Sequence, residues 1–223
     1  VDGLIVFPGT SQFLNPRLLQ MVIDKYPLVL IDQNIQIIQQ TSVGTDNALA
    51  VSQGLSYISS QGHKNVGILL PTIDNSVLQE RCDAVFQYSA ITGFPLKQEL
   101  WLKDLGHSSE IVSEESIDRI ALHLTEHPEI TALFAFQYPL AVAADQAARR
   151  IGRTTGKDLS ILCFDSPLPL FGRPQFTHLH QDEAAIGEKA VELLLELISH
   201  PVQAPQNVKI PAKLVEGESF FAL

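Results

Sequence analysis

The chain has 223 residues, of which 45% are hydrophobic and 18% are charged. That composition excludes a disordered chain and is enough for one large domain or two small lobes with packed cores. The formal net charge of -10 excludes the broad basic surface with which proteins bind a nucleic-acid backbone, so we expect this chain alone to bind DNA poorly.

Strand-like and helical runs alternate along most of the chain. In chain order we expect a strand at 4–7, a helix at 15–25, a strand at 28–31, a helix capped by Asp46, a strand at 66–70, helices at 76–92 and 113–126, a strand at 132–135, a helix at 140–151 and a strand at 161–164. Such alternation predicts an α/β fold with parallel sheets flanked by helices.

The final third of the chain has a different pattern. A short strand at 176–179 leads into a long amphipathic helix that Asp182 caps. Two short extended pieces follow, "VKIP" and "KLVEG", and each is too small to form a sheet alone. We expect these pieces to be crossing segments that return the chain between two lobes.

A helix is followed by a strand almost without a loop at Gly62, His63 and Lys64. Gly62 ends the helix, and the two side chains after it lie beside the last helical carbonyls, where positive charge is favoured. We therefore interpret His63 as structural.

The two cysteines, Cys82 and Cys163, both lie in apolar patterns, which indicates small core residues and not a disulfide. The sequence has no cationic start with an apolar signal segment, and no apolar run approaches the roughly 18 residues of a membrane span. If residue 1 lies near the natural start, these features predict a soluble cytoplasmic protein without a membrane partner.

In parallel sheets, ligands bind beyond the carboxyl ends of the strands. The loops at these ends carry hydrogen-bonding groups and no phosphate-binding glycine pattern: Pro8-Gly9-Thr10, "PTIDNSVLQER", Gln137-Tyr138 and Asp165-Ser166. The segment "GRTTGKD" is one residue short of a P-loop and has Asp where Ser or Thr is required, so we interpret it as a helix end and a turn.

Motifs over nearly the whole chain resemble the effector-binding region of the lactose-repressor (LacI/GalR) family of bacterial transcription regulators. They are "VDGLIVFP", "YPLVLID", "SVGTDN", "GHKNVGIL", Arg81, "TALFAFQYPLAVAADQAARRIG", "DLSILCFD", "FTHLHQDEAAIGEKAVELLLELI" and "IPAKLVEGES". Each is weak alone, but their shared register is specific. The resemblance implies two Rossmann-like lobes of the periplasmic binding protein-like type, with a ligand in the cleft between them.

On that plan one lobe comprises residues 1–72 plus 182–211, and the other 73–181 plus 212–223. The resemblance further implies a truncated chain: in the parent protein the start of this domain and a DNA-binding head, of LacI or GntR type, would precede residue 1. We expect a homodimer that contacts operator DNA only through that head.

The resemblance places the guanidinium of Arg81 in the cleft, where its planar fork can bind vicinal hydroxyls, a carboxylate or a phosphate. The alternative is a surface arginine paired with Glu80 or Asp83. Asp165, at the end of a strand, can accept hydrogen bonds from sugar hydroxyls or can form an Asx turn.

Gln137 and Tyr138 stand where the family usually has an Asn-Asp pair, which changes the expected sugar specificity. Asn75 and Ser76 can each either cap the following helix or contact the ligand. Thr10 is a further candidate in the loop after the first strand.

Trp101 lies near the segment from which the family sends an aromatic side chain onto a sugar face, and a place in the core suits it equally. His178, His180 and Asp182 alternate at a spacing that metal ligands can have. A strand followed by a helix cap explains them without a metal, so we expect no metal and no cofactor.

These observations predict the ligand-sensing and dimerisation domain of a transcriptional repressor that binds a sugar or a related small polar effector. The alternative is a solute-binding protein of a sugar transport system. An enzyme is a third hypothesis that the fold alone does not refute, but the sequence contains no nucleophile elbow, Cys-His pair or zinc signature to support it.

Overall fold

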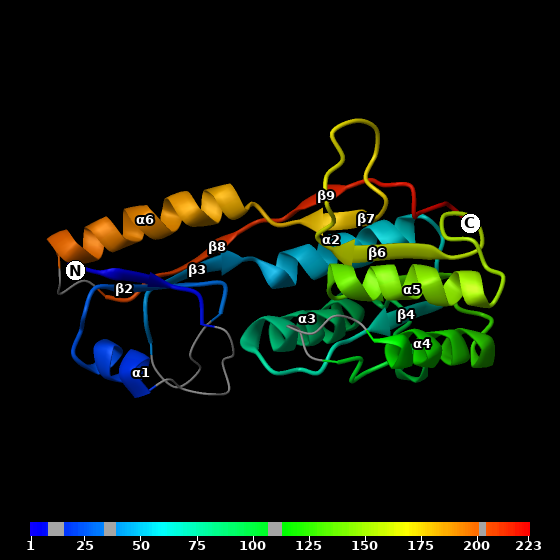
Figure 1. Cartoon of the computed structure of the whole chain (residues 1–223), viewed down its shortest axis with the longest axis horizontal. Coiled ribbons are helices and arrows are strands. Elements are labelled where there is room, and N and C mark those ends of the chain that lie inside the picture. The colour runs from blue at the N-terminus through cyan, green and yellow to red at the C-terminus, as the bar shows by residue number, and fades with distance from the viewer. Residues whose placement is uncertain (9–15, 34–38, 107–112, 201–203) are drawn as a thin grey trace.

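The computed structural model describes residues 1–8, 16–33, 39–106, 113–200 and 204–223, which form an α/β structure with two separate sheets (Figure 1). The first sheet has the strand order β1-β2-β3-β8 and is parallel throughout. Its strands are β1 (Leu4–Val6), β2 (Leu28–Ile31), β3 (Ser42–Thr45) and β8 (Asn207–Ile210).

The second sheet has the order β4-β5-β6-β7-β9, and only β9 runs antiparallel to its neighbour. Its strands are β4 (Val66–Leu69), β5 (Ala132–Ala135), β6 (Ser160–Phe164), β7 (Thr177–His180) and β9 (Lys213–Val215). The predicted fold class, parallel sheets flanked by helices, is confirmed.

Helices cover both faces of each sheet (Figure 1). Helices α1 (Pro16–Ile23) and α6 (Glu183–Ser199) pack on the first sheet. On the second sheet, α2 (Asn47–Ser60) and α3 (Ser76–Thr92) cover one face, and α4 (Glu114–Glu126) and α5 (Tyr138–Arg150) cover the other. We call each sheet with its helices the first lobe and the second lobe.

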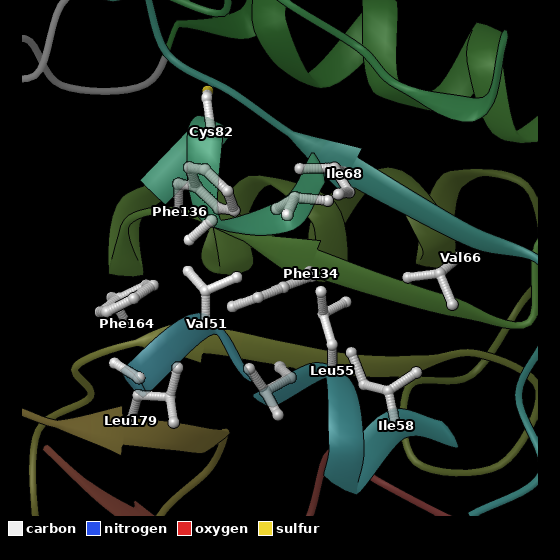
Figure 2. Packing of buried hydrophobic residues seen from close by; sticks show 14 of the residues in the cluster. Val51, Leu55, Ile58, Val66, Ile68, Cys82, Phe134, Phe136, Phe164 and Leu179 are labelled. Atoms are coloured by element: carbon white, nitrogen blue, oxygen red, sulfur yellow. The ribbon is translucent and has the colours of Figure 1, made fainter. Parts of the chain in front are cut away.

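The largest core lies between α2, α3 and the second sheet. Figure 2 shows Val51, Leu55 and Ile58 of α2 facing the rings of Phe134 and Phe164 from the strands. Each of these side chains is at most 1% exposed. Burying a side chain of this size contributes about 1.5–3 kcal/mol, so this layer is a main source of the stability of the second lobe.

Helix starts follow the capping residues predicted from the sequence. The carboxylates of Asp46 and Asp182 accept hydrogen bonds from the backbone N–H groups of Leu49 and Ala185, at 3.0 and 3.1 Å. Each bond satisfies one of the N–H groups that a helix start leaves without an intrahelical partner. Among the described helices, none is long and apolar enough to cross a membrane.

The chain passes between the lobes after β3, after β7 and after β8. The expected crossing of "VKIP" and "KLVEG" agrees with this course, since they form β8 and β9. The predicted division put residues 46–72 with the first lobe, whereas α2 packs on α3 and β4 belongs to the second sheet. Strands of parallel sheets all read as short apolar runs, so periodicity does not show which sheet a strand joins.

His63 has the structural surroundings expected of it and lies within the second lobe. Its side chain is 1% exposed, and its ring nitrogens lie 2.9 Å from the hydroxyl of Thr131 and 2.9 Å from the carbonyl oxygen of Phe221. Gly62 has a φ of 92°, which ends α2 in a conformation that glycine adopts without strain.

Candidate functional site

A cavity of about 520 Å³ has walls from both lobes and lies at the carboxyl ends of the strands. The first lobe contributes Phe7, Asp32 and Gln33, which follow β1 and β2. The second lobe contributes residues around the start of α3 and at the ends of β5, β6 and β7: Asp74, Asn75, Val77, Leu78, Arg81, Phe136, Gln137, Tyr138, Pro139, Phe164, Asp165 and Gln181.

Arg81 lies on α3 and is only 4% exposed. Its Nε donates to Asn47 Oδ1 at 2.8 Å and its Nη1 to the carbonyl oxygen of Phe136 at 2.8 Å. Its Nη2 donates to Gln181 Oε1 at 3.3 Å, and its Cζ lies 3.4 Å from the ring centroid of Phe164. The guanidinium is therefore held in one orientation by three hydrogen bonds and a cation–π contact.

Burial lowers the pKa of Arg81 from 12.5 to about 10, and the nearby carboxylates of Asp32, Asp165 and Glu80 oppose that shift. A pKa of about 10 still leaves the side chain charged at neutral pH. The alternative of a surface arginine paired with Glu80 or Asp83 is wrong, because Arg81 points into the protein. Glu80 instead accepts from Lys209, and Asp83 from Gln79.

Gln181 follows β7 at the point where the chain returns to the first lobe. Its Nε2 donates to Asp165 Oδ2 at 2.6 Å, and its backbone N–H donates to Asp165 Oδ1 at 3.2 Å. Its Oε1 accepts from Arg81 and also from Thr45 Oγ1 at 2.7 Å, at the end of β3. The side-chain amide of Gln181 thus connects Asp165 and Arg81 to Thr45, where the chain first passes between the lobes.

Asp32 and Asp165 directly follow β2 and β6, and both have left-handed backbone conformations with φ of 67° and 57°. Among residues other than glycine, Asp and Asn adopt this region most readily. Burial raises the pKa of Asp32, an effect that the charge of Arg81 opposes and those of Glu80 and Asp165 reinforce. Among these influences burial is the largest, so desolvation of the Asp32 carboxylate outweighs the positive charges of Arg81 and Lys209.

Gln33 lies next to Asp32 and is 4% exposed. Its Oε1 is buried and has no hydrogen-bond partner. Leaving a buried acceptor unpaired costs about 1–3 kcal/mol, so a donor that reached this atom would stabilise the protein.

Contacts between the lobes continue beyond the cavity wall. Glu80 on α3 accepts from Asn47 Nδ2 at 3.2 Å and from Lys209 Nζ of β8 at 2.9 Å. Through Asn47 this pair is connected to Arg81, so a salt bridge between the lobes and the cavity share one hydrogen-bond network.

The structure brings five of the sequence-predicted site residues to the cavity wall: Arg81, Asp165, Gln137, Tyr138 and Asn75. Asn75 also caps α3, where its Oδ1 accepts from the backbone N–H of Leu78 at 3.0 Å.

Two other candidates, both among the described residues, do not line the cavity. Ser76 is buried at the start of α3. Trp101 is 7% exposed and belongs to the core, where its ring centroid lies 5.3 Å from that of Phe86. Of the two alternatives for this residue, the place in the core is therefore the one observed. Thr10 lies outside the described residues.

Asp32, Gln33 and Gln181 line the cavity but were not among the predicted site residues. All three directly follow strands, β2 and β7, so the strand-end rule that found Asp165 could also have found them. The described residues contain no group of three His, Cys, Asp or Glu side chains suited to a metal. Asp182 caps α6, as the explanation without a metal predicts.

Comparison with known proteins identifies the fold and the family. Residues 55–220 match the periplasmic binding protein-like domain. The ribose operon repressor of Haemophilus influenzae is 26% identical over 100% of this chain and 65% of its own length. A regulatory protein of the LacI family from Chloroflexus aggregans has a TM-score of 0.82 and 22% identity, covering 99% of this chain and 77% of that one.

A LacI family transcriptional regulator from Enterococcus faecium, solved with bound ribose, has a TM-score of 0.78 and 19% identity and covers 100% of this chain and 80% of that one. The chain belongs to the periplasmic binding protein-like domain family, and the predicted relationship to LacI-type regulators is confirmed. It spans 56 to 65% of the length of the first three curated relatives.

Proposed function

We propose that this chain is the effector-sensing part of a bacterial transcriptional repressor and that its effector is a sugar or a related small polar metabolite. The observation that carries this proposal is the cavity of about 520 Å³ between the two lobes, with Arg81 and Asp165 fixed in its wall. Pockets for small ligands are typically about 300–1,000 Å³ and combine apolar walls with a few fixed polar groups.

The names of the relatives support the regulatory part of the proposal, since they include a ribose operon repressor, the HTH-type transcriptional repressor PurR and the HTH-type transcriptional regulator MalR. The neighbour with bound ribose supports a sugar as the effector. Asp165 and Gln137 would accept and donate hydrogen bonds to hydroxyls, while Tyr138 and Phe7 would pack on the apolar face of a sugar ring.

The effector would act by binding one arrangement of the lobes more tightly than another, because a ligand shifts an equilibrium only through its differential affinity. Contacts between the lobes, such as Lys209 with Glu80, would differ between those arrangements. We further propose a cytoplasmic homodimer whose DNA contacts come from another segment of the protein, since this chain has a formal net charge of -10.

Binding is proposed in place of turnover because the described residues of the cavity wall include no Ser, Thr, Cys, His or Lys side chain. Nucleophilic and general-base catalysis most often use those groups. The wall can hold and orient a polar ligand. Its carboxylates, Asp32, Asp74 and Asp165, are groups that acid–base catalysis also uses, so the choice of binding over turnover rests further on the names of the relatives, which are repressors and regulators.

The test is a thermal-shift screen of the full-length protein against pentoses, hexoses and nucleosides, followed by titration of operator DNA with each compound that binds. A ligand at a hundred times its dissociation constant should stabilise the protein by about 2.7 kcal/mol, a shift of roughly 5 to 10 °C. Arg81→Lys should weaken binding, because lysine lacks the planar fork, whereas Arg149→Lys, on the exposed face of α5, is the matched control.

An unchanged operator affinity with every compound that binds the cavity would refute the sensing role. Binding of sugar by a protein that has no affinity for operator DNA would favour the solute-binding alternative.

A further inference from the structure

The cavity wall has an unbalanced set of charges. Its described residues include three carboxylates, those of Asp32, Asp74 and Asp165, and one cation, Arg81. In surroundings of low dielectric constant such an excess attracts cations and repels anions much more strongly than in water.

The single cation is already engaged by the protein. Each nitrogen of the Arg81 guanidinium donates to a protein acceptor, on Asn47, Phe136 or Gln181. The ring of Phe164 covers one face of the group. These bonds use three of the five N–H groups of the guanidinium, so a phosphate or carboxylate on a ligand would have at most two of them to bind and would also lie near three carboxylates.

Several polar atoms of the wall are acceptors, beside the donor groups of Gln137 and Tyr138. Gln33 Oε1 is buried and unpaired, in a side chain that is 4% exposed. Asp165 uses its two oxygens to accept from Gln181, and each carboxylate oxygen can accept more than one bond. A ligand rich in O–H and N–H donors fits this wall better than one that brings further acceptors.

Aromatic rings complete the wall. Phe7, which is 61% exposed, and Tyr138 enter the cavity from different lobes. Such rings can pack on the C–H face of a sugar, and their faces attract ammonium groups as well. The apolar part of the wall thus also suits a neutral or cationic ligand.

We propose that the cavity takes a polyhydroxylated ligand without negative charge and that a primary amino group on such a ligand strengthens binding by lying against the carboxylates of Asp32 and Asp165. This inference rests on the proposed function and names the ligand class of the same site. A site for phosphorylated or carboxylated sugars would instead be expected to turn several basic groups toward the ligand.

The experiment uses the full-length protein and matched sugars that differ only in charge. The probes are glucose, glucosamine and glucose 6-phosphate, with ribose and ribose 5-phosphate as a second set, and with Tris and inorganic phosphate as fragments. Affinities are measured by thermal shift and calorimetry at low and high salt. We expect each phosphorylated sugar to bind at least tenfold more weakly than its neutral parent, and the amino sugar at least threefold more tightly.

Two variants test whether the preference for the amino sugar comes from the carboxylates of Asp165 and Asp32. Asp165→Asn and Asp32→Asn each remove one negative charge and keep a residue that adopts the left-handed conformation. Each should reduce the preference for the amino sugar over the neutral sugar by at least threefold. Asp83→Asn, on the exposed side of α3, is the matched control and should leave that preference unchanged.

Binding of a phosphorylated sugar as tightly as its neutral parent would overturn the inference, although the sensing of sugars would stand. An amino preference that survives both wall variants would likewise overturn the assignment to Asp32 and Asp165. If no sugar, amine or phosphate binds, the proposed function fails, and the inference fails with it.

Discussion

Replacing Gln181 by glutamate would place a second carboxylate against Asp165. In the wild-type protein Gln181 Nε2 donates to Asp165 Oδ2 at 2.6 Å, and the contact is partly buried. In the variant Gln181→Glu an oxygen takes the place of that donor. At about 3 Å and an effective dielectric constant of about 20, two unit charges repel by about 5 kcal/mol, and attraction to Arg81, whose Nη2 lies 3.3 Å from Gln181 Oε1, offsets part of that repulsion.

The pair can avoid this repulsion by sharing one proton, which limits the loss of stability. Keeping a carboxyl of ordinary pKa, about 4.3, protonated at pH 7 costs about 4 kcal/mol, and at pH 5 about 1 kcal/mol. We therefore expect Gln181→Glu to lower the free energy of unfolding by about 2–4 kcal/mol at pH 7 and by no more than about 1 kcal/mol at pH 5.

The sign follows from linkage. The introduced carboxyl would have a folded-state pKa above its unfolded value, so the variant is closest to wild type below the unfolded pKa and loses stability as the pH rises through the folded one. The assay is urea unfolding of both proteins from pH 4.5 to 8. We expect their difference to grow with pH between pH 5 and 7, by at most about 1.4 kcal/mol per pH unit.

The chain provides a matched control for this change. Gln79 Nε2 donates to Asp83 Oδ1 at 2.8 Å on the exposed surface of α3, so Gln79→Glu makes the same substitution in water. A like-charge pair one helical turn apart is expected to destabilise by only about 0.2–0.5 kcal/mol. If Gln181→Glu proves as insensitive to pH as Gln79→Glu, the partly buried acid–amide contact does not have the role described for it.

Two further substitutions test the electrostatics of the cavity and the packing beside the second sheet. Asp32→Asn removes a carboxyl whose pKa burial raises above 3.8. The free energy of unfolding of the wild type therefore falls as the pH rises from that value through the folded pKa. Over the same range the variant should become more stable relative to wild type, which urea unfolding at several pH values would measure. Gly217→Ala would bring a Cβ within 2.4 Å of the backbone of Phe176, so the melting temperature should fall by several degrees, whereas an unchanged value would contradict this packing.

The elements of the fold could be predicted from the sequence because their signals are local. Asp46 and Asp182 mark helix starts by the same hydrogen bond in the sequence argument and in the structure. The strand β3 (Ser42–Thr45) was not expected, since "SVGT" has neither a long apolar run nor a turn signal of its own. It is a strand because β2 and β8 lie on either side of it, and that is a tertiary reason.

The site could be predicted only in part, for a similar reason. The position of Asp165 after an apolar strand gave enough information to select it. The role of Gln181 depends on contacts with Thr45 and Arg81, which are 136 and 100 residues away along the chain. Trp101 shows the opposite error: an aromatic side chain suited to a sugar face is packed in the core.

The hydrogen bonds of the Gln181 amide affect how the ligand specificity of such a protein can evolve. Gln181 bonds Thr45, the last residue of β3, and the next residue, Asp46, donates its backbone N–H to Ile210 at the end of β8, at 2.8 Å. All three passages of the chain between the lobes are therefore tied to one another, and through Gln181 they are tied to Arg81 and Asp165. A substitution that adapts the cavity to a new compound will also alter the ease with which the lobes rotate. Affinity for an effector will therefore tend to evolve together with the equilibrium between lobe arrangements in the protein without ligand.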